Sequence, residues 1–279
     1  MSTEDTVPTA CTICLDDKEL PLPIQCGCGC RGASAYAHVA CKAAYAAHQG
    51  PGWHKAWFAC PTCEQDYTGA MQLGLAETLW ERESDKPKQN DGRLRAQNLL
   101  AVAYLAAGRF DEAEAIWSEI MVSWHPNHSW FNHKDTLNVA SNLGNLFNRT
   151  KQYKRAEKLL CICLERKQVL CGRRHRDTIT TAGSLAQAMQ GNGKYTRAVR
   201  LLYWVIEATK DTDDEASELY FSCPLAENLD MLGWHDEAEQ VANDASDRAN
   251  RMLGRDHPTS IDLQRMCDTL DQEDFFPTY

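Results

Sequence analysis

Eight cysteines lie in the first 63 residues of this 279-residue chain, and His38 stands among them. Two CxxC pairs, Cys11–Cys14 and Cys60–Cys63, flank the segment "CGCGCRGASAYAHVAC" at residues 26 to 41. Tetrahedral zinc takes four thiolate or imidazole ligands, and a CxxC pair supplies two of them from one turn. Eight ligands would complete two closed zinc sites, and a closed site leaves no position for a reacting water. The pattern therefore predicts two structural zinc ions and no catalytic residue.

The rest of the chain limits the class of protein. No apolar run approaches the ~18 residues of a membrane-spanning helix, and "MSTEDTVPTA" lacks the pattern of a secretory signal. We therefore expect a soluble cytoplasmic protein, with the nucleus as the alternative compartment and no membrane partner. Thiols stay reduced there and are available to bind metal. The net charge of −10 argues against a nucleic-acid partner.

The order of the candidate ligands resembles that of the RING-CH, or variant RING, finger of ubiquitin ligases. That family has a CxC pair seven residues before its histidine, and counting back over "RGASAYA" from His38 selects Cys28 and Cys30. Cys26 is then spare, and its replacement by serine is expected to be nearly silent. Cys26 and Cys28 stay open as the alternative pair, because the intervening glycines leave the loop free to shift. A PHD finger, a reader of histone tails with the same ligand order, is the alternative fold.

The resemblance implies which residues would bind zinc and a partner. In the cross-braced arrangement of that family, Cys11, Cys14, His38 and Cys41 would share one ion, and Cys28, Cys30, Cys60 and Cys63 the other. It also implies that a ubiquitin-conjugating enzyme docks on an apolar groove, whose matching positions here are Ile13, Tyr45 and Pro61. Many active fingers carry a cation directly after the last ligand. This chain has Glu64 there, so weak ligase activity is expected.

The chain beyond the finger has a helical pattern. Met71, Leu75 and Leu79 recur at four-residue spacing, which predicts a helix that packs back onto the finger. The apolar-free segment "ESDKPKQNDG" then reads as an exposed linker. Four later segments, "GRFDEAEAIW", "KQYKRAEKLL", "GKYTRAVRLL" and "GWHDEAEQVA", align on the alanines Ala113, Ala156, Ala198 and Ala238. A fixed period of this kind indicates a helical solenoid.

These segments resemble the tetratricopeptide repeats of kinesin light chains. The predicted fold is mainly α, with a small two-zinc finger followed by an α-helical solenoid of about four repeats and a capping helix. The predicted divisions are a disordered N-terminus at 1–10, the RING-CH finger at 11–69, a helix and polar linker at 70–92, the repeats at 93–270 and a tail at 271–279.

Four local features of the repeats lead to further expectations. Lys151 stands where the other repeats have a glycine in the interhelix turn, so it would be strained if that turn is left-handed. Pro224 falls inside the expected first helix of the fourth repeat, which either begins there or kinks. The segments "HKDT", "RHRDT" and "GRDHPTS" offer Asp, Thr or Ser as helix caps. Cys161 and Cys163 are expected in the core, because residues two apart on a helix cannot share a metal.

The charge distribution and the repeats together suggest a function. Residues 135–176 carry a net charge of +7 and residues 177–279 a net charge of −12. The exposed cations Lys154, Arg155 and Lys158 are therefore candidates to bind an acidic partner. The predicted function is a RING-type ubiquitin-protein ligase, whose finger docks a ubiquitin-conjugating enzyme and whose repeats recruit a protein or peptide substrate. The alternatives are a zinc-stabilised adaptor without ligase activity and, third, a histone-tail reader.

Overall fold

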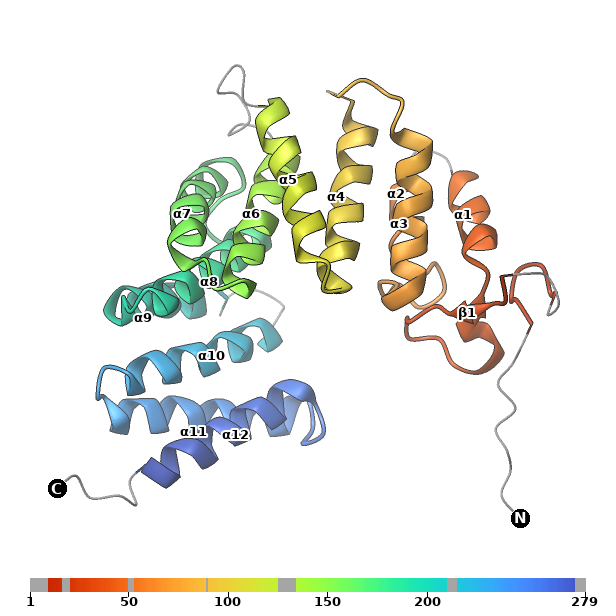
Figure 1. Cartoon of the computed structure of the whole chain (residues 1–279). Helices are drawn as coiled ribbons and strands as arrows, with labels where there is room; N and C mark the ends of the chain where they lie inside the picture. The colour runs from red at the N-terminus through yellow and green to blue at the C-terminus, as the bar shows by residue number, and fades with distance from the viewer. Residues whose placement is uncertain are drawn as a thin grey trace, which may run out of the picture. The chain divides into compact units, whose positions relative to one another are not determined.

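The computed structural model describes residues 10–16, 21–49, 53–88, 90–124, 134–209 and 215–273. The chain divides into two compact units, Met1–Asn127 and His128–Tyr279. The first contains the cysteine-rich segment and the helices that follow it, and the second is wholly helical in its described residues (Figure 1). No helix among the described residues is both long and apolar enough to cross a membrane.

The cysteine-rich segment has very little regular structure. Strands β1 (Ile24–Gln25) and β2 (Tyr36–Ala37) pair antiparallel and are followed by the helices α1 (Val39–Ala47) and α2 (Trp53–Ala56). A single 3-10 turn, Gly32–Ala35, leads into β2. A lone two-stranded hairpin is at best marginally stable in water. Other interactions must therefore hold this segment in its fold.

Helix α3 (Gly69–Glu83) provides one of these interactions. Met71, Leu75 and Leu79 are fully or almost fully buried in one cluster with Trp57 and Tyr67 of the finger. This confirms the helix expected from the four-residue spacing. Helix α3 in turn packs against α4 (Asp91–Ala106), and α4 packs against α5 (Phe110–Trp124).

One glycine sets the distance between α3 and the finger. A Cβ atom at Gly74 of α3 would lie 2.9 Å from both γ-methyl groups of Val39 on α1. Such contacts are too short for real side chains, so only glycine allows the two helices to approach this closely. Thr78 closes the same turn of α3 by donating its hydroxyl to the carbonyl of Gly74 at 2.8 Å.

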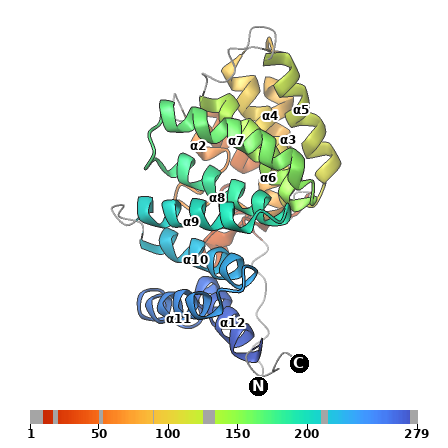
Figure 2. The same cartoon turned by 90° about the vertical axis from the view of Figure 1, so that its left-hand side faces the viewer.

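The second unit is a stack of seven helices within its described residues (Figure 2). They are α6 (Lys134–Arg149), α7 (Tyr153–Leu170), α8 (Arg176–Gly191), α9 (Tyr195–Thr209), α10 (Glu215–Asp230), α11 (His235–Met252) and α12 (Pro258–Glu273). Each helix packs on the next one in sequence, and each of α6, α8 and α10 also contacts the next even-numbered helix. The even-numbered helices therefore form one layer and the odd-numbered helices the other, as in a helical solenoid.

The aligned alanines lie where the helices of each pair meet. Ala113, Ala156, Ala198 and Ala238 all have no exposed surface. A larger side chain at these positions would push the paired helices apart, and overpacking of this kind typically costs about 1–3 kcal/mol. The periodic alanine in the sequence is therefore a packing signal, as the solenoid interpretation predicted.

The structure decides where Pro224 lies, and it shows that the expected helix caps were wrong. Helix α10 begins at Glu215, so Pro224 lies inside it and does not start it. The caps of α8 and α12 are histidines, not Asp, Thr or Ser. Nδ1 of His175 accepts from the amide of Asp177 at 3.2 Å, and Nδ1 of His257 accepts from the amide of Thr259 at 3.3 Å. An imidazole Nδ1 reaches the amide two residues ahead much as an Asn or Asp oxygen does.

The interhelix turns explain the odd residue at position 151. Gly108, Gly193 and Gly233 have φ angles of 76°, 70° and 75°, and Lys151 takes the same left-handed conformation with a φ of 59°. The conformational prediction for this turn is thus confirmed. A residue with a Cβ is strained in this region, and glycine is not.

We expect Lys151→Gly to stabilise the protein by up to about 1 kcal/mol. Relief of ~1–2 kcal/mol of left-handed strain is partly offset by the ~0.5–1 kcal/mol that glycine loses in chain entropy. Chemical denaturation of the full chain would measure the gain. Lys158→Gly is the matched control, because Lys158 is exposed within α7 and should lose about 1 kcal/mol. If both variants lose the same free energy of unfolding, glycine does not relieve strain at position 151.

Candidate functional site

The first cluster of ligand-type side chains joins the N-terminal CxxC pair to the histidine segment. It consists of Cys11, Cys14, His38 and Cys41. Nδ1 of His38 lies 3.4 Å from Sγ of Cys14 and 3.6 Å from Sγ of Cys41. A tetrahedral zinc ion with bonds of ~2.3 Å to sulfur and ~2.0 Å to nitrogen would separate these atoms by about 3.5 Å. The spacing of the donor atoms therefore suits such an ion.

The second cluster joins the CxC pair to the last CxxC pair. It consists of Cys28, Cys30, Cys60 and Cys63, whose sulfur atoms all lie within 4.8 Å of one another. Sγ of Cys30 is 3.8 Å from Sγ of Cys60. The edge of a zinc tetrahedron with four sulfur ligands is also about 3.8 Å. Each of the two clusters could hold a metal ion, and the donor set of three or four thiols is the kind that zinc prefers.

The two CxxC turns have the same backbone geometry. In the first, the amide of Leu15 donates to the carbonyl of Cys11 at 2.8 Å, and in the second the amide of Glu64 donates to that of Cys60 at 2.9 Å. Leu15 and Glu64 both adopt a left-handed conformation, with φ of 61° and 59°. The residue after each pair therefore turns the chain back sharply, so that the two thiols of the pair point to one place.

The backbone of these turns stabilises thiolates. Burial opposes ionisation of Cys60, but donation from the amides of Cys63 and Thr62 outweighs it and lowers the pKa of Cys60 to about 6. Burial likewise opposes ionisation of Cys11, where the amides of Cys14 and His38 help to lower the pKa to about 6. Zinc binds cysteine only as the thiolate. The lowered pKa of the first cysteine in each pair therefore favours the thiolate, which is the form that binds a metal cation.

Cys26 lies outside both clusters. Its side chain is buried, with 1% of its surface exposed, and it packs with Tyr67 and Leu75 in the core of the finger. Burial raises the pKa of Cys26 to about 11, so it remains a neutral thiol. The structure groups Cys28 and Cys30 and leaves Cys26 in the core. Cys26→Ser can therefore no longer be expected to be silent, because it would bury a hydroxyl in an apolar cluster.

The residues matched to a docking surface lie on the outside of the finger. A pocket of about 330 Å³ is lined by Tyr45, Pro61 and Glu64, together with Lys55. Nζ of Lys55 lies 3.8 Å from the Glu64 carboxylate, and both side chains are well exposed. Ile13, which is 43% exposed, stands on the first CxxC turn and does not line this pocket. Sequence reasoning missed Lys55, since its place beside Glu64 depends on how α2 folds against the last CxxC turn.

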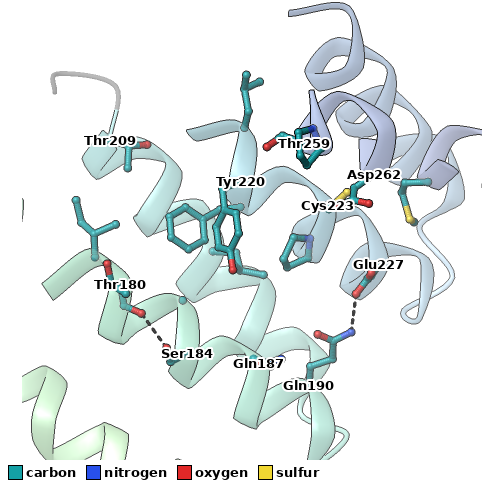
Figure 3. Close-up of a pocket in the computed structure, with 18 of the residues that line it drawn as sticks. Thr180, Ser184, Gln187, Gln190, Thr209, Tyr220, Cys223, Glu227, Thr259 and Asp262 are labelled. Atoms are coloured by element: carbon teal, nitrogen blue, oxygen red, sulfur yellow. Dashed lines mark hydrogen bonds between the residues drawn. The ribbon is translucent and has the colours of Figure 1, made fainter. Parts of the chain in front are cut away.

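A larger groove lies in the second unit. It has a volume of about 1080 Å³ and is lined by the even-numbered helices α6, α8, α10 and α12, together with Leu202 and Thr209 of α9. Tyr220 stands in the middle of it, and Thr180 and Ser184 of α8 line the wall opposite Asp262 of α12 (Figure 3). The groove could not be recognised in the sequence, because no single repeat contains enough of its lining residues. It forms only when helices from several repeats come together.

Other predicted residues lie apart from the groove. Lys154, Arg155 and Lys158 are exposed on α7, an odd-numbered helix, and the guanidinium of Arg155 stacks 4.0 Å above the ring of Phe147. Cys163 is buried on α7 as expected, but Cys161 is exposed, so its expected place in the core was wrong.

The comparisons with known proteins bear on the repeats. A tetratricopeptide repeat family model matches residues 135–211, and a second model of the same repeat matches residues 94–119. The search of curated proteins finds no match to this chain.

Solved structures agree with these matches. A crystal structure of kinesin light chain TPR-like repeats from Podosopora anserina has a TM-score of 0.55 at 24% identity, and the match covers 64% of this chain and 87% of that one. BtubC (BKLC) from P. vanneervenii has a TM-score of 0.57 at 21% identity, over 66% of this chain and 74% of that one. Likeness at this identity shows the fold alone. The helical part of the chain is thus a kinesin-light-chain-like solenoid of tetratricopeptide repeats.

Proposed function

We propose that this chain is a RING-CH-type ubiquitin-protein ligase that holds its substrate on its repeats. The observation that carries the proposal is the interleaving of the two clusters. Each takes one CxxC pair from one end of the finger and one pair from the middle, in the order of a cross-braced finger. We assign zinc to both sites, and its role when bound is to hold the fold. The reduced thiols of such sites favour the cytoplasm, or the nucleus, as the compartment.

The residues of the finger would act by positioning another enzyme. Ile13 on the first CxxC turn and Tyr45 on α1 present exposed apolar surface, and Pro61 sits on the last CxxC turn. A ubiquitin-conjugating enzyme bound there would carry the reactive thioester itself. Holding that thioester close to a substrate amine raises the rate through proximity and orientation, with no acid or base from this chain. Covalent connection to the repeats raises the local concentration of the bound substrate.

A second function is favoured by the residue after the last ligand. Glu64 is an exposed anion paired with Lys55, at a position where many active fingers carry a cation. A carboxylate can only accept hydrogen bonds, so it cannot donate to ubiquitin and to the conjugating enzyme together. The alternative function is an adaptor in which the finger binds a protein without promoting ubiquitin transfer.

We expect Ile13→Ala to abolish ubiquitin transfer while the metal content stays unchanged. The measurement is discharge of ubiquitin from a panel of thioester-loaded conjugating enzymes, with zinc measured on the same samples. Leu22→Ala is the matched control. Like Ile13, Leu22 has an exposed four-carbon aliphatic side chain, with 56% of its surface exposed, but it lies outside the proposed docking surface.

The same assay separates the ligase from the adaptor. Glu64→Arg should raise the rate of discharge, because it places a donor where the chain now has an acceptor. If Ile13→Ala leaves a measurable activity unchanged, the docking surface is elsewhere. If no conjugating enzyme is discharged even by the Glu64→Arg variant, the adaptor function replaces the ligase.

A further inference from the structure

The odd-numbered helices of the second unit present a basic face and an acidic face. The basic face is the exposed surface of α7 and α9, whose cations outnumber the exposed anions Glu165 and Glu207. Its cations are Lys154, Arg155, Lys158, Arg166, Arg197 and Arg200. The acidic face is the exposed surface of α11, where Arg251 is the one exposed lysine or arginine among the residues of that helix. Its anions are Asp236, Glu237, Asp244 and Asp247.

The two faces occupy the same place in their repeats. Lys154 and Asp236 both stand two residues before the buried alanine of their helix. Lys158 follows Lys154 by one helical turn, and Asp244 and Asp247 follow Asp236 by about two and three turns. Residues at such spacings lie on one side of a helix. Each helix therefore presents its charges as an outward stripe, on the side away from the packed alanine.

The charges of these stripes are not neutralised within the chain. In the part of the chain that the structure describes, these side chains have no ion-pair partner within 4.0 Å: Lys154, Lys158, Asp236, Asp244 and Asp247. Less exposed charges nearby are paired. Nζ of Lys194 lies 2.7 Å from the Glu157 carboxylate, and the guanidinium of Arg248 lies 2.7 Å from that of Glu218. The charges inside the solenoid are thus balanced, and the outward stripes keep opposite signs.

Each face also has an exposed aromatic side chain. Tyr203 of α9, on the basic face, is 45% exposed, and Ile162 of α7 is exposed as well. Trp234, the N-cap residue of α11, is 47% exposed beside the acidic face, and Met231 is exposed in the turn before it. Aromatic side chains surrounded by polar groups are the usual anchors of protein interfaces. Both faces could therefore bury apolar area when they are covered.

We propose that the basic face of one copy of this chain binds the acidic face of a second copy. An acidic peptide or an anionic lipid would engage the basic face alone, whereas a second copy accounts for both faces and for the aromatic side chain of each. The whole chain carries a net charge of −10, which opposes association at long range. At about 0.1 M salt the Debye length is about 10 Å, so opposite charges in contact outweigh this screened repulsion.

This contact goes beyond the functions proposed above. It joins two different faces, so it is heterologous, and each end of a pair keeps one face that can bind a further copy. It uses the odd-numbered helices, whereas the groove is lined mainly by the even-numbered ones. Self-association is therefore independent of ubiquitin transfer and of what the groove holds.

Sedimentation equilibrium of the full, zinc-loaded chain tests the contact directly. At about 0.1 M salt, we expect the average mass to rise above that of the monomer as the concentration approaches about 200 µM. Charge-guided contacts of modest area typically have dissociation constants in the micromolar range. Raising the salt to about 0.5 M should return the chain towards the monomer, because it shortens the Debye length.

Charge reversal on one face at a time locates the contact. Lys154→Glu with Lys158→Glu, and separately Asp244→Lys with Asp247→Lys, should each raise the dissociation constant at least about tenfold. A mixture of the two double variants should associate again, because each reversed face then meets a face of opposite sign. All four side chains are exposed, and lysine is a better helix former than aspartate, so neither variant should unfold. Circular dichroism checks this.

The matched control changes the net charge equally but outside both faces. Lys88→Glu with Arg265→Glu alters two exposed cations, and the dissociation constant should stay within about twofold of the parent value. An equal loss of association in this control would show that net charge alone decides the effect, and the inference would fail.

Other outcomes would also overturn the inference. A chain that stays monomeric at about 0.1 M salt and about 200 µM lacks the contact. Association that both double variants leave unchanged would use another surface. Loss in both variants without recovery on mixing would contradict the pairing of the two faces. A monomeric chain that binds a polyglutamate peptide through Lys154 and Lys158 would assign the basic face to a different partner.

Discussion

Removal of metal by a chelator is expected to unfold the finger while most of the helical signal of the chain persists. The core of the finger contains the ligands themselves, since Cys11 and Cys60 are buried in one cluster with Met71 and Leu75. Its strands have only two residues each, and much of its other apolar content is alanine, which buries little area. Structural zinc contributes on the order of 10–16 kcal/mol of apparent binding free energy, and in such modules this is folding free energy.

The structure also defines how far the unfolding should spread. Helix α3 contributes three residues to the finger's core, and Ala96 of α4 belongs to the same cluster. These two helices should loosen with the finger. The helices α6 to α12 share no ligand set with it, because among the described residues both ligand clusters lie between Cys11 and Cys63. Their amides should stay protected.

Hydrogen exchange read by peptide mass spectrometry would show this division directly, with circular dichroism at 222 nm as the global signal. The protein should contain two zinc ions per chain before chelation, and added zinc should restore both signals. The matched control is the same chelator on a sample whose sites are kept saturated with excess zinc. One zinc per chain, or loss of protection across α6 to α12, would contradict the prediction.

Much of the fold could be predicted because its signals are local or periodic. A CxxC pair fixes its own turn, and the alanine recurring in each repeat marks a helix contact that every repeat must make. The same reasoning identified the left-handed turn at Lys151, since three other repeats have glycine there. These features depend on neighbours in the sequence, so the sequence reveals them.

The features that escaped prediction depend on neighbours in space. His175 caps α8 although Asp and Thr follow it, because the choice of cap is decided by side-chain reach at the helix start. Cys26 was recognised as spare, but its burial follows from the way α3 covers the finger. The groove is lined by helices from three different repeats and the cap, so no single segment of the sequence contains it.

The comparison of Cys30→Ser with Cys26→Ser is the sharpest test of the metal sites. Cys30→Ser should release one zinc ion per chain and unfold the finger, because it removes one of four ligands and serine does not replace a thiolate. Cys26→Ser should keep both ions, since Sγ of Cys26 belongs to neither cluster. Metal content by mass spectrometry, measured on the two variants and the parent chain, separates these outcomes.

The two variants should also differ in how they lose stability. Cys26 is buried among apolar side chains, so a serine there places a hydroxyl in an apolar cluster. This should lower the free energy of unfolding by about 1–3 kcal/mol while the finger stays folded. Cys26→Ala is the matched control, because it removes the sulfur without adding a polar group and should cost less than Cys26→Ser. Thermal unfolding of the metal-loaded variants would rank them. If Cys26→Ser releases zinc while Cys30→Ser retains both ions, then Cys26 and Cys28 form the ligand pair, and the RING-CH spacing on which the ligase proposal depends does not hold for this chain.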